Sequence, residues 1–165
     1  MARSINGTAL ENKLASLGLA LPNAPRAQGH YRPWTIDNGV LFTAGQLSRN
    51  GDEAIMGRAE QDDSLEYARM AAQMCILRCL SLVKEAAGSL EAVEQVLFMR
   101  GYVCAADTFT QHTAVLNAAS DVLVELYGEK GHHARSAIGV ASLPSGGIVE
   151  IELCVRLSSS NSVGR

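Results

Sequence analysis

The stretch HHARSAIGVASLPSGGIVEIELCV, residues 132–155, decides the predicted fold because it joins two β-type segments through a turn. In residues 149–157 apolar and polar side chains alternate, which is typical of a strand with one face buried under helices. The apolar residues take the buried face, so Glu150 and Glu152 are expected on the opposite face. This strand is therefore predicted to present two carboxylates away from the core.

The first segment is predicted to pair with this strand as a β-hairpin whose turn is formed by residues 144–147. In that register Arg135 shares the face of Glu150. The small residues Ala137 and Gly139 lie on the same face and suggest that a second subunit packs closely there. Arg135 and Glu150 are then about six residues apart, or roughly 20 Å at about 3.3 Å per residue. Since two side chains of one chain cannot span that distance, a site that uses both must join two subunits.

The rest of the chain alternates between helical and β-type patterns. Apolar spacing predicts a short amphipathic helix over residues 9–20 and two long helices over residues 62–87 and 109–131. A β-hairpin around Asp37-Asn38-Gly39 and a strand over residues 94–105 complete the pattern. The order predicts an α+β two-layer sandwich, in which two long helices cover one face of a mixed sheet of about six strands.

Domain organisation and cellular context follow from length and composition. A chain of 165 residues, 47% hydrophobic and 19% charged, is predicted to form one core and to be able to oligomerise. We expect an N-terminal extension with a short helix (1–27), one domain (28–157) and a polar tail (158–165). No apolar run has the length of a signal peptide or a membrane span, which predicts a cytoplasmic protein without a membrane partner.

Charge and cysteine content argue against several classes of function. A net charge of −3 gives no basic footprint, so a nucleic-acid partner is not expected. The four cysteines show neither a disulfide framework nor metal-ligand spacing, and the four histidines show no ligand spacing either. We therefore predict free thiols and no metal site.

Several motifs together resemble the YjgF/Rid family of reactive-intermediate imine deaminases, also known as L-PSP endoribonuclease-like proteins. They are Tyr31 in GHY, TAGQ at residues 43–46, Asn117 in LNAASDVL, and above all ARSAIGVASLPSGGIVEIE at residues 134–152. The likeness extends over about residues 28–157. It implies a chorismate-mutase-like α+β fold that assembles as a homotrimer, with the sheets lining a central β-barrel and a cleft at each subunit interface.

The resemblance also implies a reaction. Family members of the deaminase type hydrolyse small enamine or imine intermediates such as 2-aminoacrylate to 2-oxo acids and ammonia, without a metal or an organic cofactor. Non-catalytic binding of a small carboxylate metabolite in the same cleft is the alternative, and endoribonuclease activity is a third hypothesis that the acidic composition disfavours. The expected partners are thus other copies of the chain and a small carboxylate-bearing metabolite.

By matching position, two residues would be catalytic. Arg135 would pair with the substrate carboxylate in a bidentate manner, and Glu150 would position or activate the attacking water. An ion pair with a glutamate at a subunit contact is the structural alternative for Arg135.

Four further residues are predicted to bind substrate: Tyr31, Asn117, the backbone at Gly45, and His133. For His133, whose neutral imidazole could supply polar contacts, a solvated loop is the alternative. The sequence departs from the family pattern at Ala44, which stands in place of a serine, at Ala137, which stands in place of a cysteine, and at the pair His132 and His133.

Overall fold

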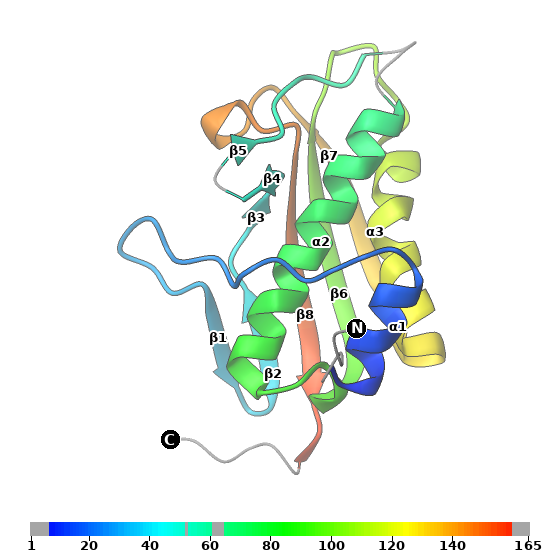
Figure 1. Cartoon of the computed structure of the whole chain (residues 1–165). Helices are drawn as coiled ribbons and strands as arrows, with labels where there is room; N and C mark the ends of the chain where they lie inside the picture. Colours follow the sequence, from blue (N-terminus) through cyan, green and yellow to red (C-terminus); the bar gives the residue numbers. More distant parts are fainter. Residues whose placement is uncertain (1–6, 52, 61–64, 160–165) are drawn as a thin grey trace, which may run out of the picture.

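The computed structural model describes residues 7–51, 53–60 and 65–159, and Figure 1 shows it as a sheet with helices packed against one face. Its helices and strands, in chain order, are α1 (Ala9–Ser16), β1 (Trp34–Asp37), β2 (Val40–Thr43), β3 (Gln46–Leu47), β4 (Arg49–Asn50), β5 (Glu53–Ala54), α2 (Leu65–Ala87), β6 (Val93–Cys104), α3 (His112–Tyr127), β7 (Ala134–Val140) and β8 (Val149–Leu157). Short 3₁₀ turns cover Leu90–Ala92, Gly128–Gly131 and Pro144–Gly146.

The main sheet has six strands in the order β1-β2-β8-β6-β7, with β3 pairing to β8 beyond the end of β2, and β4 and β5 form a separate two-stranded hairpin. The predicted α+β fold with a mixed sheet of about six strands is confirmed. The predicted pairing of the last two strands is wrong. Strand β7 runs parallel to β6, whereas β8 runs antiparallel to β6, so β6 separates the two segments expected to form a hairpin.

Two physical features explain this insertion. Strand β6 has 12 residues and therefore offers two long edges for backbone hydrogen bonds. One edge takes β7, which returns parallel after the crossover through α3, as expected for a β-α-β unit. The other edge takes β8, because residues 141–148 are long enough to cross the two strand spacings of about 10 Å that separate β7 from β8.

The helices pack against one face of the sheet and leave the other face uncovered (Figure 1). The core cluster combines residues of α2 and α3 with alternate residues of β6 and β8, such as Met99 and Leu153, which are at most 2% exposed. Arg100 and Glu152 point to the other face and form an ion pair of 3.0 Å between Nη1 and Oε2. The alternation predicted for β8 is thus confirmed.

The local elements agree with their sequence signals. Asn38 and Gly39 both have positive φ angles, 47° and 78°, as the tight turn between β1 and β2 requires. Helix α1 begins with a capping box formed by Thr8 and Glu11, and it ends at Ser16, earlier than predicted. The first long helix is confirmed over its described residues. The second begins at His112 and ends at Tyr127, so it is shorter than the predicted span of residues 109–131. Residues 62–64, the predicted start of the first, lie outside the described ranges.

All four cysteines are free thiols, as predicted. Cys75 and Cys79 are buried under the sheet, and their thiols donate to the carbonyl oxygens of Val149 and Ile151 at 3.3 and 3.5 Å. Burial raises the pKa of Cys79 to about 12 and raises the pKa of Cys75 as well, so neither is a reactive thiolate near neutral pH.

We predict that Gly131→Ala lowers the free energy of unfolding by about 2 kcal/mol or more. A Cβ at this position would lie 2.2 Å from the carbonyl oxygen of Leu123 and 2.8 Å from Cα of Val124, and a helix backbone cannot yield as a side-chain tip can. Urea unfolding would measure the loss. Gly29→Ala is the control because its Cβ would meet only the Tyr31 ring at 3.5 Å, and equal stability of both variants would contradict the prediction.

Candidate functional site

Arg135 lies on the helix-covered face of the sheet, which corrects the face predicted from the sequence. Arg135 pairs with Met99 on β6, and Met99 in turn pairs with Leu153 on β8, so the three side chains point to the same face. The side chains of Met99 and Leu153 are buried in the core. Glu150 and Glu152 alternate with Leu153 and its neighbours, so they point to the opposite face. The predicted register caused the error, since a shift by one residue moves every side chain of a strand to the other face.

A chain of hydrogen bonds holds the Arg135 side chain at the edge between α3 and β7. Nη1 of Arg135 donates to Oγ of Ser120 at 2.9 Å, and this hydroxyl lies 3.1 Å from Nε2 of His133. Nδ1 of His133 lies 2.6 Å from the carbonyl oxygen of Gly131. Because a carbonyl oxygen only accepts, Nδ1 carries the proton, and Nε2 of the neutral ring accepts from Ser120. The guanidinium is therefore oriented by groups of its own chain.

The electrostatics of this edge keep His133 neutral. Burial lowers the pKa of the His133 imidazole, and the charges of Arg135 and His132 lower it further, while the hydrogen bond to the Gly131 carbonyl acts in the opposite direction. Burial also lowers the pKa of Arg135, an effect that Asp121 opposes. An arginine nevertheless stays charged at every physiological pH. The edge thus presents a fixed positive charge beside a neutral imidazole.

Asn117 lies on the exposed surface of α3, one turn before Ser120, and so flanks the same edge. The small residues of β7 have a different role from the predicted one. A Cβ on Gly139 would lie 2.4 Å from Nε2 of His112, at the start of α3, and Ala137 packs against the core. The close packing that we predicted for a second subunit is therefore provided by the chain's own third helix.

A separate cavity surrounds Glu150 where β2 ends and β3 begins. Its volume is about 170 Å³, and its lining includes Tyr31, Gly45, Gln46 and Glu150. A Cβ on Gly45 would lie 2.1 Å from Oε1 of Glu150, so only a glycine lets the backbone approach this carboxylate so closely. Tyr31 is 54% exposed at the mouth. The structure thus brings together three of the six predicted site residues.

The Glu150 carboxyl is half-buried, and its pKa is raised above the usual value. Burial is the larger cause, and the negative charge of Glu152 adds to it. Glu152 itself is paired with Arg100 on β6. Glu150 therefore has the character of a carboxylate that can exchange a proton, whereas Glu152 has a structural partner.

Three arginines line the same cavity and were not singled out in the sequence: Arg26, Arg49 and Arg78. Arg78 comes from the middle of α2, where a lone arginine within the apolar run MCILRCLSLV was the available signal. Arg49 donates from Nη2 to Oγ of Ser145 at 3.1 Å. Ser120 was also missed, although it interrupts an apolar helix pattern in the same way. Guanidinium groups around one carboxylate make the cavity suitable for an anionic ligand.

One protomer thus carries two separate half-sites. The arginine half-site consists of Arg135, Ser120, His133 and Asn117, and the glutamate half-site consists of Glu150, Gly45 and Tyr31. Arg135 is level with Met99 and Glu150 with Tyr102, which is a separation of about 10 Å along β6 and about 10 Å across it. The two side chains also point to opposite faces. The separation of roughly 20 Å that was predicted for a hairpin is therefore wrong, but the two half-sites still do not meet within one chain.

In the part of the chain that the structure describes, histidine, cysteine, aspartate and glutamate side chains form no group of three or more that could hold a metal ion. No helix among the described residues has the length and hydropathy required to cross a bilayer.

Comparison with known proteins identifies the family. The family model described as "YjgF/chorismate_mutase-like, putative endoribonuclease" matches residues 11–157, so the match begins inside α1. The chain is 33% identical to protein TCP17 of Trypanosoma cruzi over 148 residues, which are 88% of this chain and 92% of that protein.

Two solved structures illustrate the range of similarity. The Agrobacterium tumefaciens protein Atu1372, described as having unknown function, has a TM-score of 0.83 and 34% identity, and the match covers 90% of this chain and 93% of that one. RidA from the Antarctic bacterium Psychrobacter has a TM-score of 0.56 and 27% identity, with 82% and 94% covered. The fold is thus shared with both, and the likeness to the protein of unknown function is the greater.

We predict that His133 makes stability depend on pH. Its pKa in the folded state is lower than the value of about 6.5 in the unfolded chain, so the unfolded state binds a proton more readily. The neutral imidazole of His133 makes its full contribution to folding stability above about pH 6.5, and this contribution decreases as the pH falls from that value toward the pKa of the folded state.

Urea unfolding of the wild type and of His133→Gln between about pH 5 and pH 8 tests this. The variant should lose less stability on acidification than the wild type. His30→Gln, which changes an exposed imidazole outside both half-sites, is the control and should keep the wild-type slope. The same slope in His133→Gln and the wild type would contradict the assignment.

Proposed function

The chain belongs to the YjgF/chorismate-mutase-like family, and we propose that it hydrolyses small carboxylate-bearing imines or enamines in clefts between the subunits of a homotrimer. One observation carries the proposal: a cation suited to a carboxylate and a carboxylate suited to proton transfer stand on opposite faces of one protomer. Arg135 and Glu150 do not meet within one chain. Juxtaposing the arginine half-site of one subunit and the glutamate half-site of its neighbour would complete the constellation.

Arg135 has the role of binding the substrate. Its guanidinium has five N–H donors in a planar fork, and the hydrogen bond to Ser120 uses one of them. The fork matches the two oxygens of a carboxylate, and the bond to Ser120 limits its rotation. Because Arg135 holds the carboxylate of the substrate, the substrate would be oriented with its C=N carbon toward the neighbouring subunit.

Glu150 has the role of general base. Its carboxylate takes a proton from a water molecule while the water oxygen bonds to the imine carbon, and it passes this proton to the nitrogen, which gives a carbinolamine. It then takes the hydroxyl proton of the carbinolamine and gives it to the nitrogen, so that the C–N bond breaks, ammonia leaves and the C=O bond forms. Water and imine supply all atoms of the 2-oxo acid and ammonia, so the proposed reaction requires no cofactor. A raised pKa suits a group that must both accept and donate a proton.

The likeness to RidA from Psychrobacter, which has the same fold and is 27% identical to this chain, supports this assignment. The four free thiols fit the reducing cytoplasm, which we propose as the compartment.

We predict that Arg135→Ala and Glu150→Gln are each inactive alone but complement each other when mixed. In randomly mixed trimers, about a quarter of the clefts would receive an intact arginine half-site from one subunit and an intact glutamate half-site from the next. Co-expression with two affinity tags, followed by measurement of 2-oxo acid release from freshly generated 2-aminoacrylate, tests this. Activity of neither single variant nor the mixture, despite an active wild-type trimer, would show that the site does not join two subunits.

We also predict that Arg135→Lys reduces kcat/KM by about tenfold or more, because an ammonium keeps the charge but loses the bidentate geometry. Arg156→Lys is the matched control, since Arg156 is exposed on β8 and lies in neither half-site. Analytical ultracentrifugation should show a trimer for both variants. Equal loss in both, or a rate for the wild type no higher than for buffer, would refute the deaminase assignment.

Non-catalytic binding of a small carboxylate in the same cleft is the second candidate, and the guanidinium of Arg135, which Ser120 orients, favours it. In that case 2-oxobutyrate raises the melting temperature of the wild type but not of Arg135→Ala, and no turnover of 2-aminoacrylate accompanies binding. Turnover above the buffer rate decides against this candidate.

A further inference from the structure

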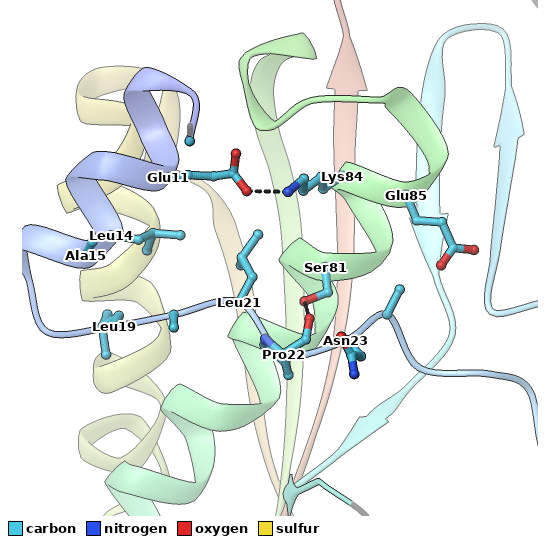
Figure 2. A pocket seen from close by; sticks show the side chains of 13 residues that line it. Glu11, Leu14, Ala15, Leu19, Leu21, Pro22, Asn23, Ser81, Lys84 and Glu85 are labelled. Carbon is cyan, nitrogen blue, oxygen red and sulfur yellow. Dashed lines mark hydrogen bonds and ion pairs between the residues drawn. The ribbon is translucent and has the colours of Figure 1, made fainter. Parts of the chain in front are cut away.

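A cavity larger than the one at Glu150 lies away from both half-sites, under the N-terminal segment. Its volume is about 510 Å³, within the range of ordinary small-molecule sites. Figure 2 shows it between α1, the extended segment of residues 19–24, and one side of α2. None of its lining residues belongs to the arginine or glutamate half-sites. Ligand binding in this cavity would therefore be independent of the function proposed for the two half-sites.

The walls of this cavity are fixed by contacts at both ends. Helix α1 is anchored by Leu14, which is 1% exposed, and by the backbone N–H of Leu10, which donates to Oε1 of Glu91 at 2.9 Å. The extended segment is anchored where the Ser81 hydroxyl donates to the carbonyl oxygen of Pro22 at 2.8 Å (Figure 2). The cavity is therefore preformed by elements that are tied to the rest of the chain.

The lining combines an apolar wall with an ion pair. Leu14, Leu19 and Leu21 supply the apolar side, and Lys84 on α2 pairs with Glu11 on α1 across the cavity (Figure 2). Glu11 is 22% exposed, and its other oxygen accepts from the backbone N–H of Thr8 at 3.1 Å. This glutamate is thus held in place by two donors from two elements.

The charges select the class of ligand. The ammonium of Lys84 has three N–H donors, and the bond to Glu11 uses one of them. A ligand that is only anionic would be attracted by Lys84 but repelled by Glu11 and by Glu85 at the rim, and one that is only cationic would meet the opposite problem. A zwitterion gains at both ends, because its carboxylate approaches Lys84 while its ammonium approaches a glutamate.

We propose that this cavity binds a free α-amino acid with an aliphatic side chain. The carboxylate would take the remaining donors of Lys84, the ammonium would lie by Glu11 or Glu85, and the side chain would cover Leu14, Leu19 and Leu21. Ala15, at the edge of the cavity, sets the room for that side chain.

Isothermal titration calorimetry with three probes of one shape tests the proposal. L-Leucine has both charges, 4-methylpentanoate lacks the ammonium, and 3-methylbutylamine lacks the carboxylate. Leucine should bind saturably, and the affinity of each of the other two compounds should be lower by about tenfold or more. Equal binding of all three, or no saturable binding of leucine to the folded wild-type protein, would overturn the proposal.

Variants locate the site. Lys84→Met removes the ammonium and keeps the length of the side chain, so leucine affinity should fall about tenfold. Lys13→Met makes the same change on α1 outside the cavity lining and should leave affinity unchanged. Ala15→Phe fills the cavity without removing an ion pair and should abolish binding. Wild-type affinity in both cavity variants would overturn the proposal.

Arg135→Ala separates this proposal from the proposed function. It should keep leucine binding while it loses the response to 2-oxobutyrate. Loss of leucine binding in Arg135→Ala together with retention in Lys84→Met would place the amino acid in the intersubunit cleft and refute the cavity site.

Discussion

The position of β6 between β7 and β8 is the constraint on which the rest of the structure depends. Backbone hydrogen bonds from both of its edges fix the levels of Arg135 and Glu150 and, through strand alternation, the face that each side chain takes. Had β7 and β8 paired directly, the same residues would share one face. The inserted strand therefore places Arg135 and Glu150 on opposite faces of the sheet, in two half-sites that remain apart.

Each half-site is built by a local departure from regular packing. Between β2 and β3 the chain leaves the sheet at Ala44 and Gly45, and the missing side chain at Gly45 lets the backbone contact the carboxylate of Glu150. At the other edge, Ser120 replaces an apolar contact of α3 with a hydroxyl that joins Arg135 to His133. Hydrogen bonds and backbone approach thus orient the charged groups before any ligand arrives.

The sequence predicted the elements better than it predicted their pairing. Periodicity located the long helices, the Asn38-Gly39 turn and the alternation of β8, because each of these signals is local. The pairing of β7 depends on which strand edges are open after β6 and α3 have folded, and no short stretch encodes that competition. The same limit hid Ser120 and Arg78, each a lone polar residue in a helical pattern. Ser120 bonds to Arg135 on β7, and Arg78 lines the Glu150 cavity together with residues of other elements.

Assembly would change the chemistry of the glutamate half-site as well as complete it. In one protomer, burial and Glu152 raise the pKa of Glu150, which favours the protonated form. A guanidinium brought near by a neighbouring subunit would act in the opposite direction, because an opposite charge stabilises the carboxylate. A bound substrate carboxylate would partly cancel that effect by neutralising the guanidinium. The proton affinity of Glu150 would thus respond to both the neighbour and the substrate, so that substrate binding would partly restore the base strength that the neighbouring guanidinium lowers.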